Sequence, residues 1–299
     1  MRIIRYTDLN LEPVLAALTA SGEVYPLPQK DFIELSQQAE QSNLSISDLI
    51  ESAIFNLNPL PQTVEDLNLI VPLEAPEVWA SGVTYERSRE ARNYESTGGN
   101  HDSETFYDLV YDAKRPELFL KSTAARTVGP NEAVCLRSDS QWQIPEPELG
   151  LIINSKGVIL GYTAGNDMSC RDIEGENPLY LPQAKIWKNA CSIGPSILLA
   201  DAVKDPYQFS ITCRIYRDGH KIVEEMSSTK QLKRTYEELV SYLIKDNQIF
   251  DGTVLLTGTS IVPPTDFTLL EGDEIEIEIS DIGILKNCVQ LAAKTESVL

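Results

Sequence analysis

The chain of 299 residues has little histidine, little positive charge and no long apolar run. It contains only His101 and His220, so a histidine-based triad or a histidine-rich metal site has little material. Its 25 Lys and Arg face 45 Asp and Glu, and the net charge of −20 argues against nucleic acid and anionic membrane surfaces as partners. No stretch is apolar for the length that a bilayer requires, and the N-terminus has no signal-peptide core, which predicts a cytoplasmic protein.

Cysteine is also sparse. The five cysteines are widely spaced and none forms a Cys-x-x-Cys pair, which argues against disulfides and structural zinc. The length allows one large domain or two smaller ones, and the apolar content of 42% with 23% charged residues is typical of a globular protein.

The most informative feature present is Glu146-Pro-Glu148, followed by Asp167 at the end of an apolar run. In extended backbone, side chains two residues apart leave the same face, so Glu146 and Glu148 point at one spot, where Asp167 can join them. Three converging carboxylates repel one another unless a cation lies between them, and an all-oxygen set suits Mg²⁺, with Mn²⁺ or Ca²⁺ as alternatives. In an acidic chain, Glu-x-Glu is also typical of a solvated strand face.

The chain divides into a small N-terminal α+β unit, residues 1–73, and a larger β-rich unit, residues 74–299. Proline-rich stretches from Pro59 to Pro76 separate the two. Ser45, three residues before Asp48, predicts the start of a capped helix in the first unit. The fold class expected for the whole chain is α+β and β-rich, neither a doubly wound sheet nor an alternating barrel.

Turn residues and periodicity predict the main elements of the larger unit. Hairpins are expected around Asn154–Gly157 and Asp218–Gly219, and the alternation of Glu and Ile over 274–279 predicts a strand with one buried face. Helical patterns occupy about residues 85–94, 104–114 and 232–245.

The segments around the carboxylates follow one another in a specific order, namely Pro145–Gly150, Gly161–Glu174, Asn177–Lys185, Cys191–Pro195, Leu256–Thr259 and Gly272–Asp273. This succession resembles the fumarylacetoacetate hydrolase superfamily over about residues 77 to 290. The resemblance implies a mixed β-sandwich or roll as the catalytic domain, Mg²⁺ or a similar ion held by Glu146, Glu148 and Asp167, and Lys185 beside that metal. It also implies a homo-oligomer, a dimer or a tetramer.

One stretch departs from the common pattern of that superfamily. Many members that cleave carbon–carbon bonds carry Asn-Tyr-x-x-His-x-x-Glu, whereas here Ser88 stands where the His would be and Ala91 where the Glu would be. Without that pair, hydrolysis loses its general base. Further segments resemble a branch of the superfamily that dehydrates 2-keto-3-deoxy sugar acids. That branch converts 2-keto-3-deoxy-D-arabinonate into 2,5-dioxopentanoate in pentose oxidation. The segments that carry this resemblance are Gly82–Glu86, Arg115–Glu117, Phe119–Lys121, Arg137–Ser140, Asn177–Pro182 and Thr257–Pro263.

Such a dehydration needs a metal, a base at C3, an acid for the leaving hydroxyl and a cation for the substrate carboxylate. Lys185 is the first candidate for proton transfer, because a lysine near a dication can have its pKa lowered; a role as charge stabiliser is the alternative, and a Schiff base is a weaker one. Glu117 is a second acid or base candidate, and its alternative is a surface ion pair with Arg115.

Four residues are candidates for binding the substrate, a small 2-keto sugar acid: Ser88, Arg89, Thr257 and Thr259. The planar fork of Arg89 matches a carboxylate, but an ion pair with Glu86 or Glu90 on a helix surface is the alternative. Thr-Gly-Thr at 257–259 is also ordinary turn chemistry. The glycine-rich residues 95–103 are a candidate lid over the site.

Two rival readings remain open. A carbon–carbon hydrolase, a decarboxylase or an isomerase of 2-keto or acylpyruvate acids would use the same metal site, and only the missing His and Glu favour dehydration. A non-catalytic sugar-acid-binding protein could keep the scaffold, although retention of Lys185 and all three carboxylates argues against it.

Overall fold

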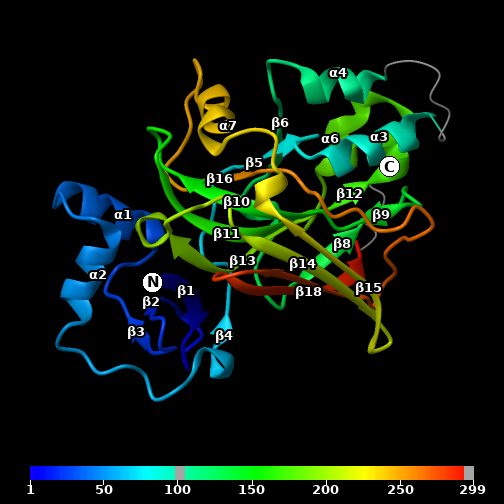
Figure 1. Ribbon diagram of the computed structural model, residues 1–299. Coiled ribbons are helices and arrows are strands. Elements are labelled where there is room, and N and C mark those ends of the chain that lie inside the picture. The colour runs from blue at the N-terminus through cyan, green and yellow to red at the C-terminus, as the bar shows by residue number, and fades with distance from the viewer. Residues whose placement is uncertain (98–104, 293–299) are drawn as a thin grey trace, which may run out of the picture.

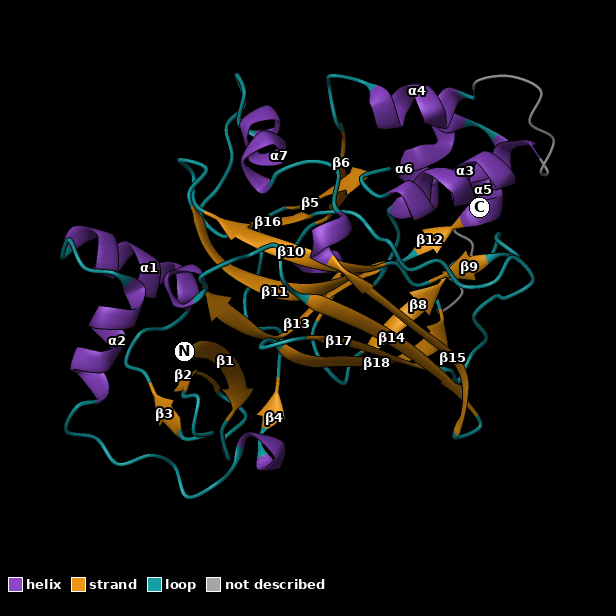
Figure 2. Ribbon diagram, in the orientation of Figure 1, coloured by secondary structure: helices purple, strands orange, loops and turns teal. Residues whose placement is uncertain are grey.

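The computed structural model describes residues 1–97 and 105–292, in which two large β-sheets pack face to face (Figures 1 and 2). Residues 98–103 of the candidate lid lie outside the described part of the chain. Within that part, no helix has both the length and the apolar character needed to cross a membrane. The β-rich α+β class expected from the sequence is confirmed, with parallel and antiparallel strand pairs mixed in both large sheets.

The larger sheet has eleven strands. Its main path is β3 (Val24–Pro26), β2 (Pro13–Leu18), β1 (Arg2–Thr7), β13 (Cys191–Leu199), β11 (Ile159–Asp167), β10 (Pro147–Ile153), β16 (Thr253–Leu256), β5 (Val78–Gly82) and β6 (Glu117–Ser122). Off this path, β4 (Asn68–Leu69) pairs with β1 and β7 (Thr127–Val128) pairs with β13. Because β1 pairs with β13, the strands of residues 1–73 continue the sheet of the larger unit; the division at residue 73 stays a prediction.

The second sheet has five strands, in the order β15 (His220–Ser228), β14 (Ser210–Arg217), β17 (Glu274–Ile279), β18 (Gly283–Leu291) and β8 (Ala133–Leu136). A two-stranded ladder joins β12 (Ser169–Cys170) to β9 (Gln143–Ile144). Both predicted hairpins are confirmed as the pairs β10–β11 and β14–β15. On β17 the three isoleucines are buried while the three glutamates stay partly exposed, as the alternation predicts.

The helices lie at the edges and ends of the sheets: α1 (Phe32–Gln41), α2 (Ile46–Ile54), α3 (Glu86–Thr97), α4 (Phe106–Asp112), α5 (Arg171–Glu176), α6 (Leu181–Lys185) and α7 (Tyr236–Leu243). Short 3₁₀ helices occupy Val64–Asp66, Ala124–Arg126, Pro178–Tyr180, Ala200–Ala202 and Thr229–Gln231. Three helices predicted from the sequence correspond to α3, α4 and α7, and Ser45 caps α2 by accepting from the Asp48 amide, as expected. Helices α5 and α6, within the motif segments, were not predicted.

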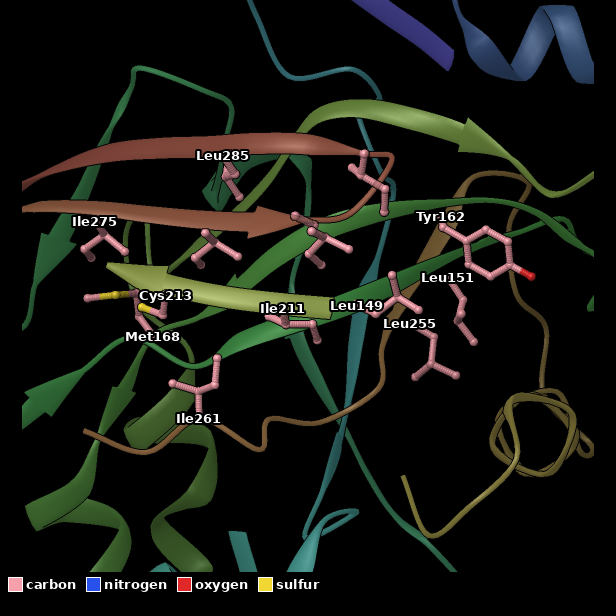
Figure 3. Close-up of a cluster of buried hydrophobic side chains, with 14 of the residues drawn as sticks. Leu149, Leu151, Tyr162, Met168, Ile211, Cys213, Leu255, Ile261, Ile275 and Leu285 are labelled. Carbon is pink, nitrogen blue, oxygen red and sulfur yellow. The ribbon is translucent and has the colours of Figure 1, made fainter. Parts of the chain in front are cut away.

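The core between the sheets is made of aliphatic side chains from both (Figure 3). Leu149, Leu151 and Leu255 of the larger sheet face Ile211 and Ile275 of the smaller one, and each is at most 1% exposed. Burial of this apolar area fixes the relative position of the sheets. Figure 2 shows α3, α5 and α6 beside one another past the ends of β5 and β6, and these helices enclose the site.

Candidate metal centre

Adjacent antiparallel strands bring three carboxylates together. Glu148 lies near the start of β10, Asp167 ends β11, and the Asp167 amide donates to the carbonyl of Glu146 across the ladder at 3.0 Å. One oxygen of each carboxylate lies within 4.8 Å of one oxygen of the other two, and the three residues are at most 2% exposed. The convergence predicted from the spacing is therefore confirmed, and the solvated strand face is excluded.

Glu146 is surrounded by cations. Lys185, at the end of α6, contacts its Oε2, while Arg171 Nη2 and Arg92 Nη2 lie 2.7 Å and 3.3 Å from its Oε1. Burial on its own raises the pKa of this carboxyl, but Lys185, Arg171 and Arg92 outweigh it and hold the pKa at about 2. Glu146 is therefore ionised in the folded protein at any neutral pH.

The pKa of Glu148, two residues after Glu146, is shifted in the opposite direction. Burial, together with the neighbouring carboxylates of Asp167 and Glu146, raises its pKa well above the usual range. Its Oε2 accepts a hydrogen bond of 2.6 Å from the Gly258 amide. Gly258 has a φ of 95°, and a Cβ there would lie 2.0 Å from Thr84 Oγ1, so only glycine suits this contact.

Lys121 is a buried cation whose role the sequence analysis did not assign. Its Nζ lies 2.7 Å from Asp167 Oδ1, donates to the carbonyl of Met168 at 2.7 Å and also donates to the carbonyl of Lys185. The sequence did contain an indication that Lys121 belongs to the site. Glu117, Phe119 and Lys121 alternate along β6, and side chains two residues apart share one face of a strand. Lys121 thus offsets the charge of Asp167 and fixes the end of the helix that carries Lys185.

Glu117 reaches the site from the first position of β6. Burial raises the pKa of its carboxyl to about 7, with Arg92 and Lys185 opposing the rise and Glu174 and Glu146 adding to it. Its Oε2 lies 2.1 Å from where a Cβ on residue 82 would be, so Gly82 leaves the space that the carboxylate fills. The alternative partner, Arg115, instead lies over the ring of Tyr242 at 5.2 Å.

The carboxylate triad, Lys185, Arg92 and Glu117 line a cavity of about 10 Å³. Its wall is formed by Ser81, Gly82, Val83, Ser88, Arg92, Glu117, Phe119, Glu146, Glu148, Asp167, Lys185 and Thr259. The volume suits a single ion or water molecule. Val83 has a φ of 51°, strained for a β-branched residue, at the turn from β5 into α3.

Only two of the four predicted substrate-binding residues lie in the wall of this cavity. Ser88 and Thr259 line the cavity, whereas Arg89 and Thr257 do not. Arg89 Nη2 forms the alternative ion pair with Glu86 at 3.2 Å, and the Thr257 hydroxyl donates to the Leu149 carbonyl. Arg92, which the sequence analysis did not select, lies in the wall instead.

The donor set fits a hard divalent cation. Glu146, Glu148 and Asp167 offer oxygens only, and burial together with the carboxylates of Asp167 and Glu146 raises the pKa of Glu148, a repulsion that a bound dication would relieve. Lys185 is cationic here: burial lowers its pKa, but Asp167, Glu146 and Glu174 outweigh burial and raise it above the usual value. The lowering expected from the sequence depends on a dication beside Lys185 and stays a prediction.

Residues 88–290 match the family model described as the C-terminal domain of fumarylacetoacetate hydrolase. A probable 2-keto-3-deoxyxylonate dehydratase of Haloferax volcanii is 42% identical over 279 residues, which cover 91% of this chain and 94% of that protein. A 2-dehydro-3-deoxy-D-arabinonate dehydratase of Saccharolobus solfataricus is 48% identical over 222 residues, 74% of each chain.

Among solved structures, a 2-keto-3-deoxy-D-arabinonate dehydratase complexed with magnesium and 2,5-dioxopentanoate superimposes with a TM-score of 0.81. It is 38% identical, and the match covers 98% of this chain and all of that one.

Proposed function

The chain belongs to the fumarylacetoacetate hydrolase family, and on that basis we propose that it is a Mg²⁺-dependent hydro-lyase acting on a 2-keto-3-deoxy sugar acid. The reaction converts 2-keto-3-deoxy-D-arabinonate into 2,5-dioxopentanoate and water, a step of pentose catabolism. The observation that carries the proposal is the cavity in which the carboxylate triad, Lys185 and Glu117 meet while Ser88 occupies the place of a hydrolytic histidine. The names and the bound product of the similar dehydratases support the same reaction.

Glu146, Glu148 and Asp167 would hold the metal. A bound Mg²⁺ supplies a Lewis acid that polarises the keto group and stabilises the negative charge that develops when a C3 proton leaves. Glu117 takes that proton, since a pKa of about 7 lets it exchange protons near neutral pH. Lys185, held cationic by its carboxylate neighbours, stabilises negative charge and donates toward the leaving C4 hydroxyl.

The polar wall of the cavity binds the substrate in this proposal. The hydroxyls of Ser88 and Thr259 line the space and are available to hydrogen-bond its hydroxyl groups. Thr257 contributes by fixing the loop: its hydroxyl donates to the Leu149 carbonyl, and its own carbonyl accepts from Thr84. Arg89, outside the wall, would act only on the approach to the site.

We expect purified protein to convert 2-keto-3-deoxy-D-arabinonate into 2,5-dioxopentanoate when Mg²⁺ is present, with the aldehyde followed by mass spectrometry. Glu148→Gln is the matched control, because it keeps the shape of the side chain, adds no charge to this buried site and removes a metal ligand. Product that disappears with a chelator and in this variant supports the proposal. Cleavage or decarboxylation of acylpyruvates or oxaloacetate in place of dehydration would overturn it.

Metal binding is expected to release a proton. Burial and the carboxylates of Asp167 and Glu146 raise the pKa of Glu148, and this carboxyl must be ionised to become a ligand, so protons compete with the metal for it. The affinity for Mg²⁺ therefore rises with pH until the raised pKa is passed. Titration calorimetry in two buffers of different ionisation enthalpy should show that protons are released on binding; heats that do not depend on the buffer would contradict this.

The proposal also includes a cytoplasmic location and a homo-oligomeric state. All five cysteines are free thiols, which is typical of the reducing cytoplasm. A homo-oligomer is supported by β15, which lies at an edge of the five-stranded sheet and exposes Ile222 and Met226.

A further inference from the structure

Arg92 lies in the wall of the cavity that holds the carboxylate triad. It lies on α3, is 5% exposed, and is one of two cationic side chains in the wall of the cavity, the other being Lys185. Lys185 contacts Glu146 and lies 3.5 Å from Asp167, so two carboxylates of the triad already engage it. Arg92 is the cation of the wall that the triad holds least tightly.

The three cations around Glu146 differ in how they approach it. Lys185 and Arg171 contact the carboxylate closely, whereas Arg92 Nη2 is the most distant, at 3.3 Å. Arg171 is buried behind the wall, and Arg92 lies in the wall itself. The carboxylate of Glu174, which accepts from the Ser169 hydroxyl at 2.8 Å, pairs with Arg92 Nη1. The guanidinium is therefore anchored at one side, and its other side is directed toward the metal ligand.

A dication changes the balance at Glu146. If Glu146 held Mg²⁺, the ion would offset the charge of the carboxylate and would repel the guanidinium of Arg92 beside it. A 2-keto acid brings a negative charge to the same place, and the planar fork of arginine pairs with a carboxylate through two parallel hydrogen bonds. We propose that Arg92, anchored by Glu174, exchanges its contact with Glu146 for the substrate carboxylate and so selects 2-keto acids. This inference rests on the proposed function.

The test uses oxalate, a dianion with the spacing of the carboxylate and keto oxygens of a 2-keto acid, titrated calorimetrically into Mg²⁺-loaded protein. Arg92→Met is expected to weaken oxalate binding about 10- to 100-fold, the loss typical of a charged hydrogen bond. Its affinity for Mg²⁺ without oxalate should be equal to that of the wild type or higher, because a positive charge near a metal ligand has been removed. Arg87→Met, on the exposed side of α3 and outside the wall, is the matched control and should keep both affinities.

Each outcome has a defined meaning. Wild-type protein that binds neither oxalate with Mg²⁺ nor turns over the keto acid refutes the proposed function itself. Wild-type binding that Arg92→Met leaves unchanged overturns only the role of Arg92, and so does a variant that loses Mg²⁺ affinity, since Arg92 would then merely support Glu146.

Arg92→Lys is a second test variant, because Arg92→Met leaves the buried carboxylate of Glu174 without this partner and that protein could fail to fold. Lysine keeps the charge and loses the fork. It should retain Mg²⁺ affinity and bind oxalate about tenfold more weakly, with KM for the keto acid raised more than kcat is lowered. Oxalate binding equal to that of the wild type would overturn the inference.

Discussion

Replacing Glu117 with Gln is expected to lower kcat for the dehydration by about 10²- to 10⁴-fold, the usual contribution of a positioned acid or base. Glutamine keeps the shape that fills the space left by Gly82 but cannot accept a proton. The affinity for Mg²⁺ should change little, since Glu117 is not one of the three converging carboxylates. Steady-state kinetics and calorimetric metal titration check the two parts separately, and Glu90→Gln on the exposed side of α3 is the control.

The pH profile gives the direction of proton transfer. Burial raises the pKa of Glu117 to about 7, and a base must be ionised, so kcat/KM should fall as the pH drops below about 7 and this limb should be absent from Glu117→Gln. A loss of kcat/KM above pH 7 instead would make Glu117 the acid and leave the removal of the C3 proton to Lys185. Activity that survives the substitution would remove Glu117 from the mechanism.

Local features of the fold were predictable because the cause lies within a few residues. Asn154–Gly157 and Asp218–Gly219 form turns by their own backbone preferences, and the hairpins follow. The convergence of Glu146 and Glu148 likewise needs only a two-residue period. The pairing of β1 with β13 joins residues almost 200 positions apart, and no local pattern specifies it.

The part of the site on α3 could not be read from the sequence. This helix carries charged and polar residues around its whole circumference, so periodicity does not indicate which side faces inward. Arg89 and Arg92 are three residues apart, and only the packing of α3 against α5 decides which of them meets Glu146 and Glu174. The direction in which the pKa of Lys185 is shifted could not be read from the sequence either. It depends on the carboxylates of Asp167, Glu146 and Glu174, which come from three separate segments of the chain.

Lys121→Met is expected to destabilise the protein by about 3 to 5 kcal/mol, the cost of removing one partner from a buried ion pair. Methionine fills a similar volume, so packing is nearly conserved, but Asp167 Oδ1 loses the cation at 2.7 Å and two buried carbonyls lose a donor. For a chain of this length the melting temperature should fall by roughly 10 °C. Thermal and urea unfolding of the metal-free protein measure the effect.

The same substitution should act on the metal centre, which separates it from a general loss of packing. Without Lys121, Asp167 keeps the cation of Lys185 at 3.5 Å but has less positive charge beside it, so the pKa of Glu148 rises further and protons compete more strongly with Mg²⁺. Lys114→Met, an exposed lysine on the segment that leads into β6, should change neither stability nor metal affinity. A Lys121→Met protein that melts like the wild type and binds Mg²⁺ equally well would show that Asp167 does not require Lys121 as a buried partner. A group that offsets the charge of a metal ligand must change either the stability or the metal affinity when it is removed.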